Sequence, residues 1–536
     1  MAHAASSIIE SPLPPVDVPA TTVSRHIREL ARRRPADVAL VDAASGRSIT
    51  YGDLDLQIGR FAAGLAAIGF KPGDRLLMLA PNLPEWAVAG LGALAAGGVI
   101  SGANPLNHVE DLAWQIRDVG ARFIFTVAPL RSAAREAAAA AGGARLIVLG
   151  DPAGAADDEI AYPSLLAAAG TRDDPPPVVA EDPDALAAVP YSSGTTGRQK
   201  GVMLTHRTIL ANVVQYLAQT KEPDDEGHTV CLAFLPMFHI FGFTVILLAG
   251  LVDGSKIVTL PRFEPEPFLK AIQDYRVTHL GVVPPILQFM ARHPLVAGFD
   301  LSSLKAVGCG AAPLGSALEL QAQERLRCRV VQGFGMTESS GVVAATVPGR
   351  ERHGASGQLL PGTQARVVDP GTLQDVARGE SGEIWFRGPQ AFKGYLNQPE
   401  ATAATITRDG WVRTGDIGHV DDDGYLYLTD RLKELIKVKG YQVAPAELEA
   451  LLFTHPDVAD AAVIGRADER AGEVAVAYLV PRQRIDPEGI KAWVARRVSE
   501  YKQLADVVVC DAIPKTPSGK ILRRVLRAQD AQRIAG

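Results

Sequence analysis

Short runs of consecutive apolar residues alternate with longer amphipathic or small-residue segments along most of the chain. Residues 38–42, 75–79, 123–127 and 146–149 form such runs. Runs of this length without polar alternation are typical of parallel strands that are covered on both faces. The segments between them are long enough for helices that cross over a sheet. The pattern therefore predicts an α/β fold with layered, open sheets.

Helices are predicted at residues 23–34, 84–97 and 208–217, and Thr50 stands where it can cap another helix. Residues 421–428 indicate a tight turn followed by an alternating strand. The remaining hundred or so residues have a lysine-rich, self-contained pattern. We therefore expect a boundary near residues 430–434, with a large α/β domain at 1–430 and a small α+β domain at 431–536.

Composition excludes several classes of protein. Of 536 residues, 47% are hydrophobic and 21% are charged, values that exclude wholesale disorder and fibrous structure. A net charge of −6 argues against a dedicated nucleic-acid partner. The four cysteines are widely separated, which argues against a zinc site.

The chain start lacks the basic and apolar regions of a secretion signal, so we expect a cytoplasmic protein without stable membrane association. The oligomeric state, monomer or homodimer, stays open.

The segment 191–206, YSSGTTGRQKGVMLTH, is rich in glycine and hydroxyl residues. Such residues leave backbone N–H groups bare and add hydroxyl donors, which suits the oxyanions of a polyphosphate, and Lys200 adds a positive charge. A strand is predicted before this loop at 185–191 and a helix after it, which argues against a flexible linker. The spacing does not match a P-loop, because Gln199 follows Gly194 by five residues.

Further motifs follow in a fixed order. They are PMFHIFG at 236–242, GAAPLG at 310–315, QGFGMTE at 332–338, RTGD at 413–416, DRLKELIKVKGYQVAPAE at 430–447 and PSGK at 517–520. With the glycine-rich loop, they resemble the AMP-forming adenylating enzymes over nearly the whole chain. This superfamily contains acyl-CoA and aryl-CoA ligases, peptide-synthetase adenylation domains and luciferases. The likeness is greatest to the 4-coumarate–CoA ligases and their bacterial relatives.

The resemblance implies a large N-terminal domain and a small, mobile C-terminal lid. It implies a reaction in two steps: a carboxylic acid and Mg²⁺-bound ATP give an acyl adenylate, and CoA then takes the acyl group and releases AMP. A hydroxycinnamate-like aryl acid is the expected substrate. A medium- or long-chain fatty acid, or another acyl acceptor, is the alternative. A carrier-loading module, a luciferase-like oxygenase and a non-catalytic nucleotide sensor are also considered.

The resemblance also assigns roles to individual residues. Catalytic roles in adenylation fall to Lys520, His239, Lys437 and Gln442. The lid would present its CoA-binding edge at Lys439 and Gly440, and Lys433 matches the hinge of the lid. The ATP and AMP contacts are expected at Ser192, Ser193, Gly194, Thr195, Thr196, Gly197, Lys200, Ala311, Gln332, Gly333, Phe334, Thr337, Asp416, Arg431 and Lys433.

The turn at 332–338 can offer Phe334 as a stacking face for adenine, Thr337 to the α-phosphate and Glu338 to Mg²⁺. Asp416 can accept hydrogen bonds from the ribose hydroxyls. Without the resemblance, His239 also fits a buried core histidine, and Lys520 fits a solvated surface charge.

The acyl pocket is expected at His239, Phe241, Val245, Gly310, Gly333, Gly341 and Val342. Plant coumarate ligases tend to have Tyr at the position of Phe241 and Pro at the position of Gly341. Loss of a phenol hydroxyl and of a stiff proline predicts a more apolar and roomier pocket.

Overall fold

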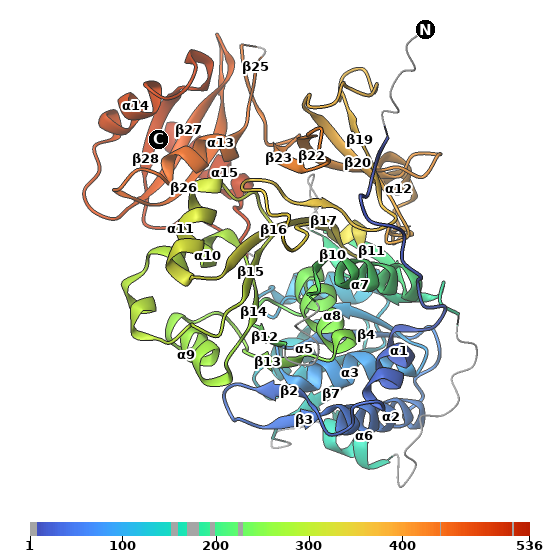
Figure 1. Cartoon of the computed structure of the whole chain (residues 1–536). Helices are drawn as coiled ribbons and strands as arrows, with labels where there is room; N and C mark the ends of the chain where they lie inside the picture. Colours follow the sequence, from blue (N-terminus) through green and yellow to red (C-terminus); the bar gives the residue numbers. More distant parts are fainter. Residues whose placement is uncertain are drawn as a thin grey trace.

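The computed structural model describes residues 8–151, 159–168, 182–192, 199–222, 229–439, 441–516 and 519–535. Within these residues the chain forms four β-sheets (Figure 1). Three of them, with their covering helices, make up the large N-terminal domain, and the fourth forms the core of the small C-terminal domain. The expected division into a large α/β part and a small α+β part is confirmed.

The first sheet is parallel at its centre, where β5, β4, β6 and β7 pair in that order. Their side chains are buried on both faces, as the apolar runs predict. The strands are β4 (Arg75–Leu79), β5 (Val99–Gly102), β6 (Phe123–Val127), β7 (Arg145–Leu149), β8 (Ile160–Ala161), β9 (Leu186–Ala188), β10 (Tyr191–Ser192), β11 (Lys200–Thr205) and β21 (Gly394–Tyr395).

The second sheet has a parallel centre in the order β15, β14, β12, β13 and β2, and this sheet forms the floor of the site. Its strands are β2 (Val38–Asp42), β3 (Ser48–Thr50), β12 (Val230–Ala233), β13 (Lys256–Thr259), β14 (His279–Val282), β15 (Ala306–Cys309), β16 (Arg329–Met336), β17 (Gly341–Ala345) and β18 (Gln358–Leu359).

Helices connect and cover these two sheets. Thr50 caps α2 by accepting a hydrogen bond from the backbone N–H of Asp53, as predicted. The helices are α1 (Val23–Ala31), α2 (Tyr51–Ala67), α3 (Pro84–Ala95), α4 (Val109–Val119), α5 (Arg131–Ala140), α6 (Tyr162–Ala168), α7 (His206–Thr220), α8 (Ala249–Asp253), α9 (Pro265–Tyr275), α10 (Pro284–Arg292), α11 (Ser316–Leu326) and α12 (Pro399–Thr405).

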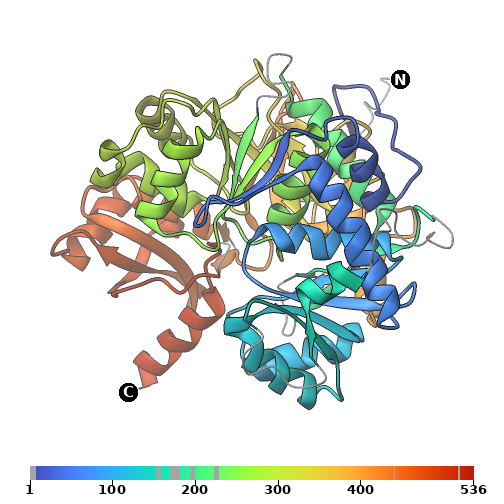
Figure 2. The same cartoon turned by 90° about the horizontal axis from the view of Figure 1, so that it is seen from below.

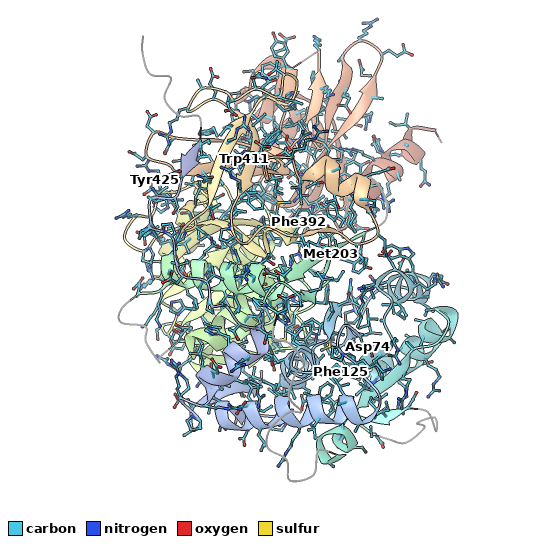
Figure 3. All side chains as sticks on the ribbon, turned by 90° about the vertical axis from the view of Figure 1, so that its right-hand side faces the viewer. Asp74, Phe125, Met203, Phe392, Trp411 and Tyr425 are labelled. Carbon is cyan, nitrogen blue, oxygen red and sulfur yellow. The ribbon has the colours of Figure 1, made fainter. Side chains whose placement is uncertain are left out.

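The third sheet is antiparallel and was not predicted as a unit, although its last hairpin was. Trp411, beside its strand β22, lies far from Phe125 of the first sheet in Figure 3. The turn at residues 421–424 joins β22 to β23, as the sequence predicts. The strands are β1 (Ile9–Glu10), β19 (Gln364–Val368), β20 (Gly382–Arg387), β22 (Val412–Val420) and β23 (Leu426–Arg431).

The C-terminal domain has a hydrophobic core of its own, with Leu448, Val463 and Leu479 fully buried in it. Its elements are β24 (Ile436–Val438), β25 (Tyr441–Val443), α13 (Pro445–Leu452), β26 (Val458–Asp468), β27 (Gly472–Pro481), α14 (Pro487–Ala495), β28 (Leu504–Val509) and α15 (Arg523–Ala535). The chain enters it between β23 and β24. The boundary predicted at residue 430 falls in the last residues of β23 and stays a prediction.

The C-terminal domain packs against the helices of the second sheet (Figure 2). From α10, the Gln288 side chain donates a hydrogen bond to the Ala459 carbonyl at 3.0 Å, and the Arg292 guanidinium donates one to the Phe453 carbonyl at 3.0 Å. These contacts fix one orientation of the small domain over the large one.

One local prediction is wrong, and one element was not predicted. The glycine-rich loop was expected to join a strand to a helix, but β11 lies between the loop and α7 and pairs antiparallel with β10. Glycine and lysine at the start of β11 conceal this strand in the sequence. The apolar segment Phe241–Leu248 forms a π-helix, which its composition does not reveal. In the part of the chain that the structure describes, no helix combines the length and apolar character needed to cross a membrane.

Candidate active site

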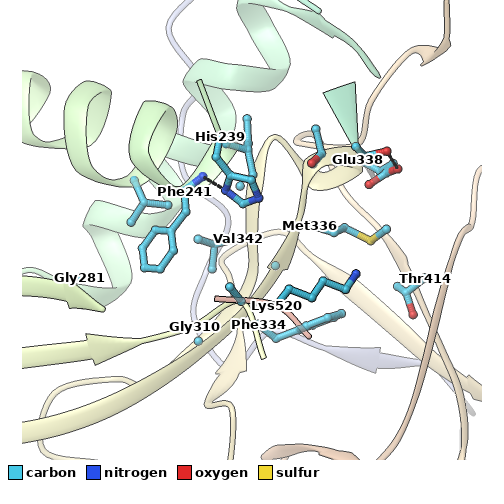
Figure 4. A pocket seen from close by; sticks show the side chains of 18 of the residues that line it. His239, Phe241, Gly281, Gly310, Phe334, Met336, Glu338, Val342, Thr414 and Lys520 are labelled. Atoms are coloured by element: carbon cyan, nitrogen blue, oxygen red, sulfur yellow. Dashed lines mark hydrogen bonds between the residues drawn. The ribbon is translucent and has the colours of Figure 1, made fainter. Parts of the chain in front are cut away.

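A cavity of about 720 Å³ lies where the carboxyl ends of β14–β16 meet the π-helical segment and the C-terminal domain (Figure 4). Its walls include His239 and Phe241 on one side and Glu338 on another. Lys520 reaches it from the C-terminal domain. In open α/β sheets, ligands bind at the carboxyl ends of strands, so the position suits a substrate site.

Glu338 is held in place by two hydroxyl donors. Ser192 donates to its Oε1 at 3.1 Å and Tyr395 donates to the same oxygen at 2.8 Å. The Lys200 amine lies 4.7 Å from the centre of the Tyr395 ring, which brings a cation next to the carboxylate. The sequence analysis did not single out Tyr395. It lies on β21, which pairs with β11, and this pairing joins segments about 190 residues apart.

This group fits a Mg²⁺ ion bound largely through phosphate oxygens. Mg²⁺ is commonly held by one or two carboxylates together with substrate phosphates and water. Glu338 supplies one buried carboxylate. Among the described residues there is no group of three or more His, Cys, Asp or Glu side chains that could hold a metal alone.

Asp416 and Arg431 face one another across β22 and β23. The Nε of Arg431 lies 3.0 Å from Asp416 Oδ1, and this carboxylate raises the pKa of the guanidinium. The second oxygen, Asp416 Oδ2, is buried without a hydrogen-bond partner among the described residues. A buried carboxylate oxygen without a donor is costly, so this oxygen is suited to accept hydroxyl groups of a ligand.

Lys520 lies alongside Phe334, with its amine directed toward the side of Met336 and Thr414 (Figure 4). The turn before it is held by the Gly519 N–H, which donates to the Thr516 carbonyl at 2.8 Å. Burial lowers the pKa of Lys520 to about 8, and the nearby cations Arg431 and Lys433 contribute to the shift. Residues 517 and 518 of the PSGK motif lie outside the described residues.

His239 begins the π-helical wall of the cavity. Its Nδ1 accepts a hydrogen bond from the Phe241 backbone N–H at 3.3 Å (Figure 4). Burial, together with the positive charge of Lys520, lowers the pKa of the imidazole to about 4. The ring is therefore neutral at pH 7 and neither attracts nor repels an entering carboxylate through a net charge.

Phe241, Val245, Gly310, Gly333, Gly341 and Val342 all line the cavity, as the acyl-pocket prediction requires. The interpretation of Gly341 needs correction, however. Its φ is +145°, which proline cannot adopt, and a Cβ there would lie 2.5 Å from Asn212 Oδ1. Glycine at this position allows α7 to approach β17 closely, and the missing side chain does not widen the pocket.

Several expected ATP contacts also line the cavity: Ser192, Lys200, Ala311, Gln332, Gly333, Phe334, Thr337 and Arg431. The Gln332 side chain donates to Glu319 Oε2 at 2.6 Å, on the buried side of β16. The side-chain N–H groups of Gln332 are thus engaged within the protein. Ala311 has a φ of +70°, a strained conformation of the kind that clusters at functional sites. Ser193, Gly194, Thr195, Thr196 and Gly197 lie outside the described residues.

Three residues expected to act in adenylation or to contact ATP, Lys437, Gln442 and Lys433, do not line the cavity in this orientation of the C-terminal domain. Lys437 and Gln442 pair across the β24–β25 hairpin, where both are exposed and outside the cavity. Lys439 is also exposed in this hairpin, and Gly440 lies outside the described residues. Lys433 is exposed on the connection between β23 and β24. The structure therefore brings Lys520 to the cavity and leaves the other face of the domain turned away.

Two family models match the chain. The model described as AMP-binding enzyme matches residues 27–396, and the model of the AMP-binding enzyme C-terminal domain matches residues 447–520. The glycine-rich loop, the cavity walls up to β21 and the lid with Lys520 fall inside these two ranges.

Known proteins are similar over nearly the whole chain. The 4-coumarate–CoA ligase of Vanilla planifolia is 40% identical over 500 residues, covering 91% of this chain and 90% of the relative. The 4-coumarate–CoA ligase 2 of Oryza sativa subsp. japonica is 41% identical over 542 residues, covering 98% and 95%. The crystal structure of ATP-bound MatB from Rhodopseudomonas palustris has a TM-score of 0.85 and 28% identity, covering 95% of this chain and 99% of that one.

The matched ranges, the identities and the shared fold agree, and the chain belongs to the AMP-binding enzyme family.

Proposed function

We propose that this protein is an AMP-forming ligase that joins a carboxylic acid to CoA through an acyl adenylate. The main supporting observation is that Lys520, Glu338, Arg431 and His239 line one cavity although they come from two domains, and that Asp416 forms an ion pair with Arg431. A cation, a metal-binding carboxylate and a hydroxyl acceptor in one site match the needs of a nucleotide and an acid that react with each other.

In the first step, a carboxylate oxygen of the acid attacks the α-phosphorus of ATP, and pyrophosphate leaves. Negative charge accumulates on the α-phosphate and is shared with the incoming carboxylate. Lys520 can place its ammonium between these two oxyanions, where positioned charge stabilises the transition state. Asp416 would hold the ribose, Phe334 would stack on the adenine and Glu338 would hold Mg²⁺, which supplies positive charge to the phosphates.

In the second step, the CoA thiol attacks the acyl carbon, a thioester bond forms and AMP leaves. We assign the CoA edge to the hairpin with Lys439 and Gly440. To Lys437 and Gln442, in the same hairpin, we assign roles in the formation or handling of the adenylate. The hairpin faces away from the cavity in this structure, so the second step requires rotation of the C-terminal domain about Lys433. The division of the chain at residue 430 is part of this proposal.

An aryl acid of the hydroxycinnamate kind is the substrate we propose. The relatives from Vanilla and rice are named for ligation of 4-coumarate to CoA, and the apolar walls at Phe241, Val245 and Val342 suit an aromatic ring. A fatty acid, or an acyl acceptor other than CoA, is the second candidate.

The test is pyrophosphate release from ATP, measured with and without CoA across a panel of aryl and alkyl acids. We expect acid-dependent release, formation of the CoA thioester and faster turnover when CoA is present. Pyrophosphate release at the same rate with and without an acid would contradict adenylation of the acid. If pyrophosphate release is equally fast with and without CoA, and only hydroxylamine takes up the acyl group, then the acceptor is not CoA.

A further inference from the structure

Part of the floor of the cavity is free of side chains. Alternate residues of a strand face the same side of a sheet. On β15 the positions that face the cavity are Ala306, Gly308 and, directly after the strand, Gly310. In register with Gly308 lie Gly281 of β14 and Val331 of β16, and Gly333 of β16 lies beside Gly310. Three neighbouring strands thus present backbone to the cavity where side chains would normally stand.

The cavity extends along these strands from Gly310 to the level of Ala306. Ala306 is in register with His279 of β14 and with Arg329 of β16, and all three line the cavity. Gly310 lies four residues further along, near His239. Four residues of a strand span about 13 Å. The cavity therefore reaches well beyond the length of a carboxylate attached directly to one ring.

Part of the floor is covered by a side chain and part is open. The Phe241 ring lies 3.3 to 3.4 Å from the Cβ positions that Gly281 and Gly310 would have. Around the corresponding position of Gly308 there is no atom within 4 Å. The free space thus continues past Phe241 and over Gly308, toward Tyr216 and Thr220 of α7, which also line the cavity.

We propose that the acid is elongated and apolar, extending over Gly308, and that the absence of a side chain at Gly308 sets the length that is accepted. The proposal rests on the proposed function and names the class of acid. Para-extended cinnamates and medium-chain fatty acids share this shape, and the experiment distinguishes them.

The experiment measures kcat/KM for acid-dependent pyrophosphate release with two short acids, benzoate and butanoate, and two long ones, 4-propoxycinnamate and decanoate. The wild-type enzyme should prefer the long acids. In Gly308→Val, kcat/KM for the long acids should fall by roughly 10- to 200-fold, the range that small changes of pocket size produce. The values for the short acids should not change. Whichever long acid is preferred identifies the aryl or alkyl class.

Gly298→Val is the matched control. Gly298 is exposed, lies outside the cavity and also has no atom within 4 Å of its Cβ position. This variant should keep the wild-type profile, and Gly308→Ala should fall between the wild type and Gly308→Val. An unchanged melting temperature of the Gly308 variants establishes that they fold.

Equal losses for short and long acids in Gly308→Val, or a wild-type preference for the short acids, would overturn the inference and leave the ligase assignment intact. Absence of pyrophosphate release with every acid would overturn the proposed function and the inference with it.

Discussion

The ammonium group of Lys520 lies where its surroundings oppose its charge. The side chain is largely removed from water, and both Arg431 and Lys433 are close enough to lower its pKa. Such an arrangement is unfavourable for the protein without substrates. When the α-phosphate and the substrate carboxylate are bound in the cavity, their negative charges would stabilise the ammonium group. The residue is therefore poised to interact with bound substrates more strongly than with its own protein.

Lys520→Ala should lower the rate of acyl-adenylate formation by about 10²- to 10³-fold, the usual cost of losing one positioned group at a developing charge. Conversion of supplied acyl adenylate and CoA to the thioester should continue, because this step involves no attack on phosphorus. Single-turnover measurements of the two half-reactions make the comparison. Near-normal ATP-dependent turnover in the variant would contradict the assignment.

The pKa of Lys520 predicts an alkaline limit of activity. Its ammonium loses a proton near pH 8, so kcat/KM for adenylate formation should fall above about pH 8. In Lys520→Arg the side chain stays charged, so kcat/KM should not fall above pH 8, although the rate is lower. The same fall in both enzymes would mean that another group causes it.

Unfolding does not account for the predicted loss of activity. An unfolded lysine has a pKa near 10.5, so the folded state binds fewer protons at Lys520 between pH 8 and that value. This residue by itself makes stability rise with pH across the window. A melting temperature that does not fall between pH 8 and 9 would separate the two effects.

Single residues of the site were predicted unevenly. Glu338, Phe334 and Lys520 belong to local motifs, and the structure brings them to one cavity. Tyr395 was missed, because its contact with Glu338 depends on the pairing of β21 with β11 and not on a neighbouring motif. The direction of the Gln332 side chain was missed for the same reason, since it is set by Glu319 of α11.

At the scale of elements, the buried strands were predictable because their apolar runs reflect burial on both faces. The π-helix at 241–248 was not, since its eight apolar or small residues would suit an α-helix or a buried strand equally well. The register of this segment decides that Phe241 faces Gly281 and Gly310. The shape of the pocket thus depends on the element that the sequence specifies least.

The packing of α7 on β17 gives a prediction at this scale. Gly341→Ala should lower the midpoint of urea unfolding, because alanine at a φ of +145° is strained by about 1–3 kcal/mol and its Cβ would clash with Asn212. Gly46→Ala is the control, since Gly46 has a φ of +72° and no atom within 4 Å of its Cβ position. Equal shifts in both variants would exclude a contribution from the contact with Asn212.

At the scale of the whole molecule, one small domain carries groups for two half-reactions on different faces. Lys520 lies in the cavity, whereas Lys439 of the proposed CoA edge is exposed on the β24–β25 hairpin. The motifs reveal both groups, but a sequence cannot show that they face different directions. Nor does it reveal which orientation the domain adopts, because that depends on contacts such as those of Gln288 and Arg292.

Lys433→Pro should separate the two half-reactions. Proline fixes φ near −65° and restricts Leu432, which limits rotation of the chain between β23 and β24. We expect the variant to keep much of its acid-dependent pyrophosphate release and to lose most thioester formation, because Lys520 already reaches the cavity in the observed orientation. Lys433→Ala, which keeps backbone freedom, is the control. Parallel losses of both half-reactions, or no loss of either, would show that Lys433 is not the pivot.

Gly341 and Gly308 differ in how well they tolerate substitution, in natural evolution or in the laboratory. Substitution of Gly341 collides with Asn212, so most variants there are expected to be removed by loss of folding before any new activity can be selected. At Gly308, in contrast, an added Cβ would have no atom within 4 Å. Acid preference can therefore drift by single substitutions at almost no cost in stability, which makes this cavity a favourable starting point for directed evolution toward other acids.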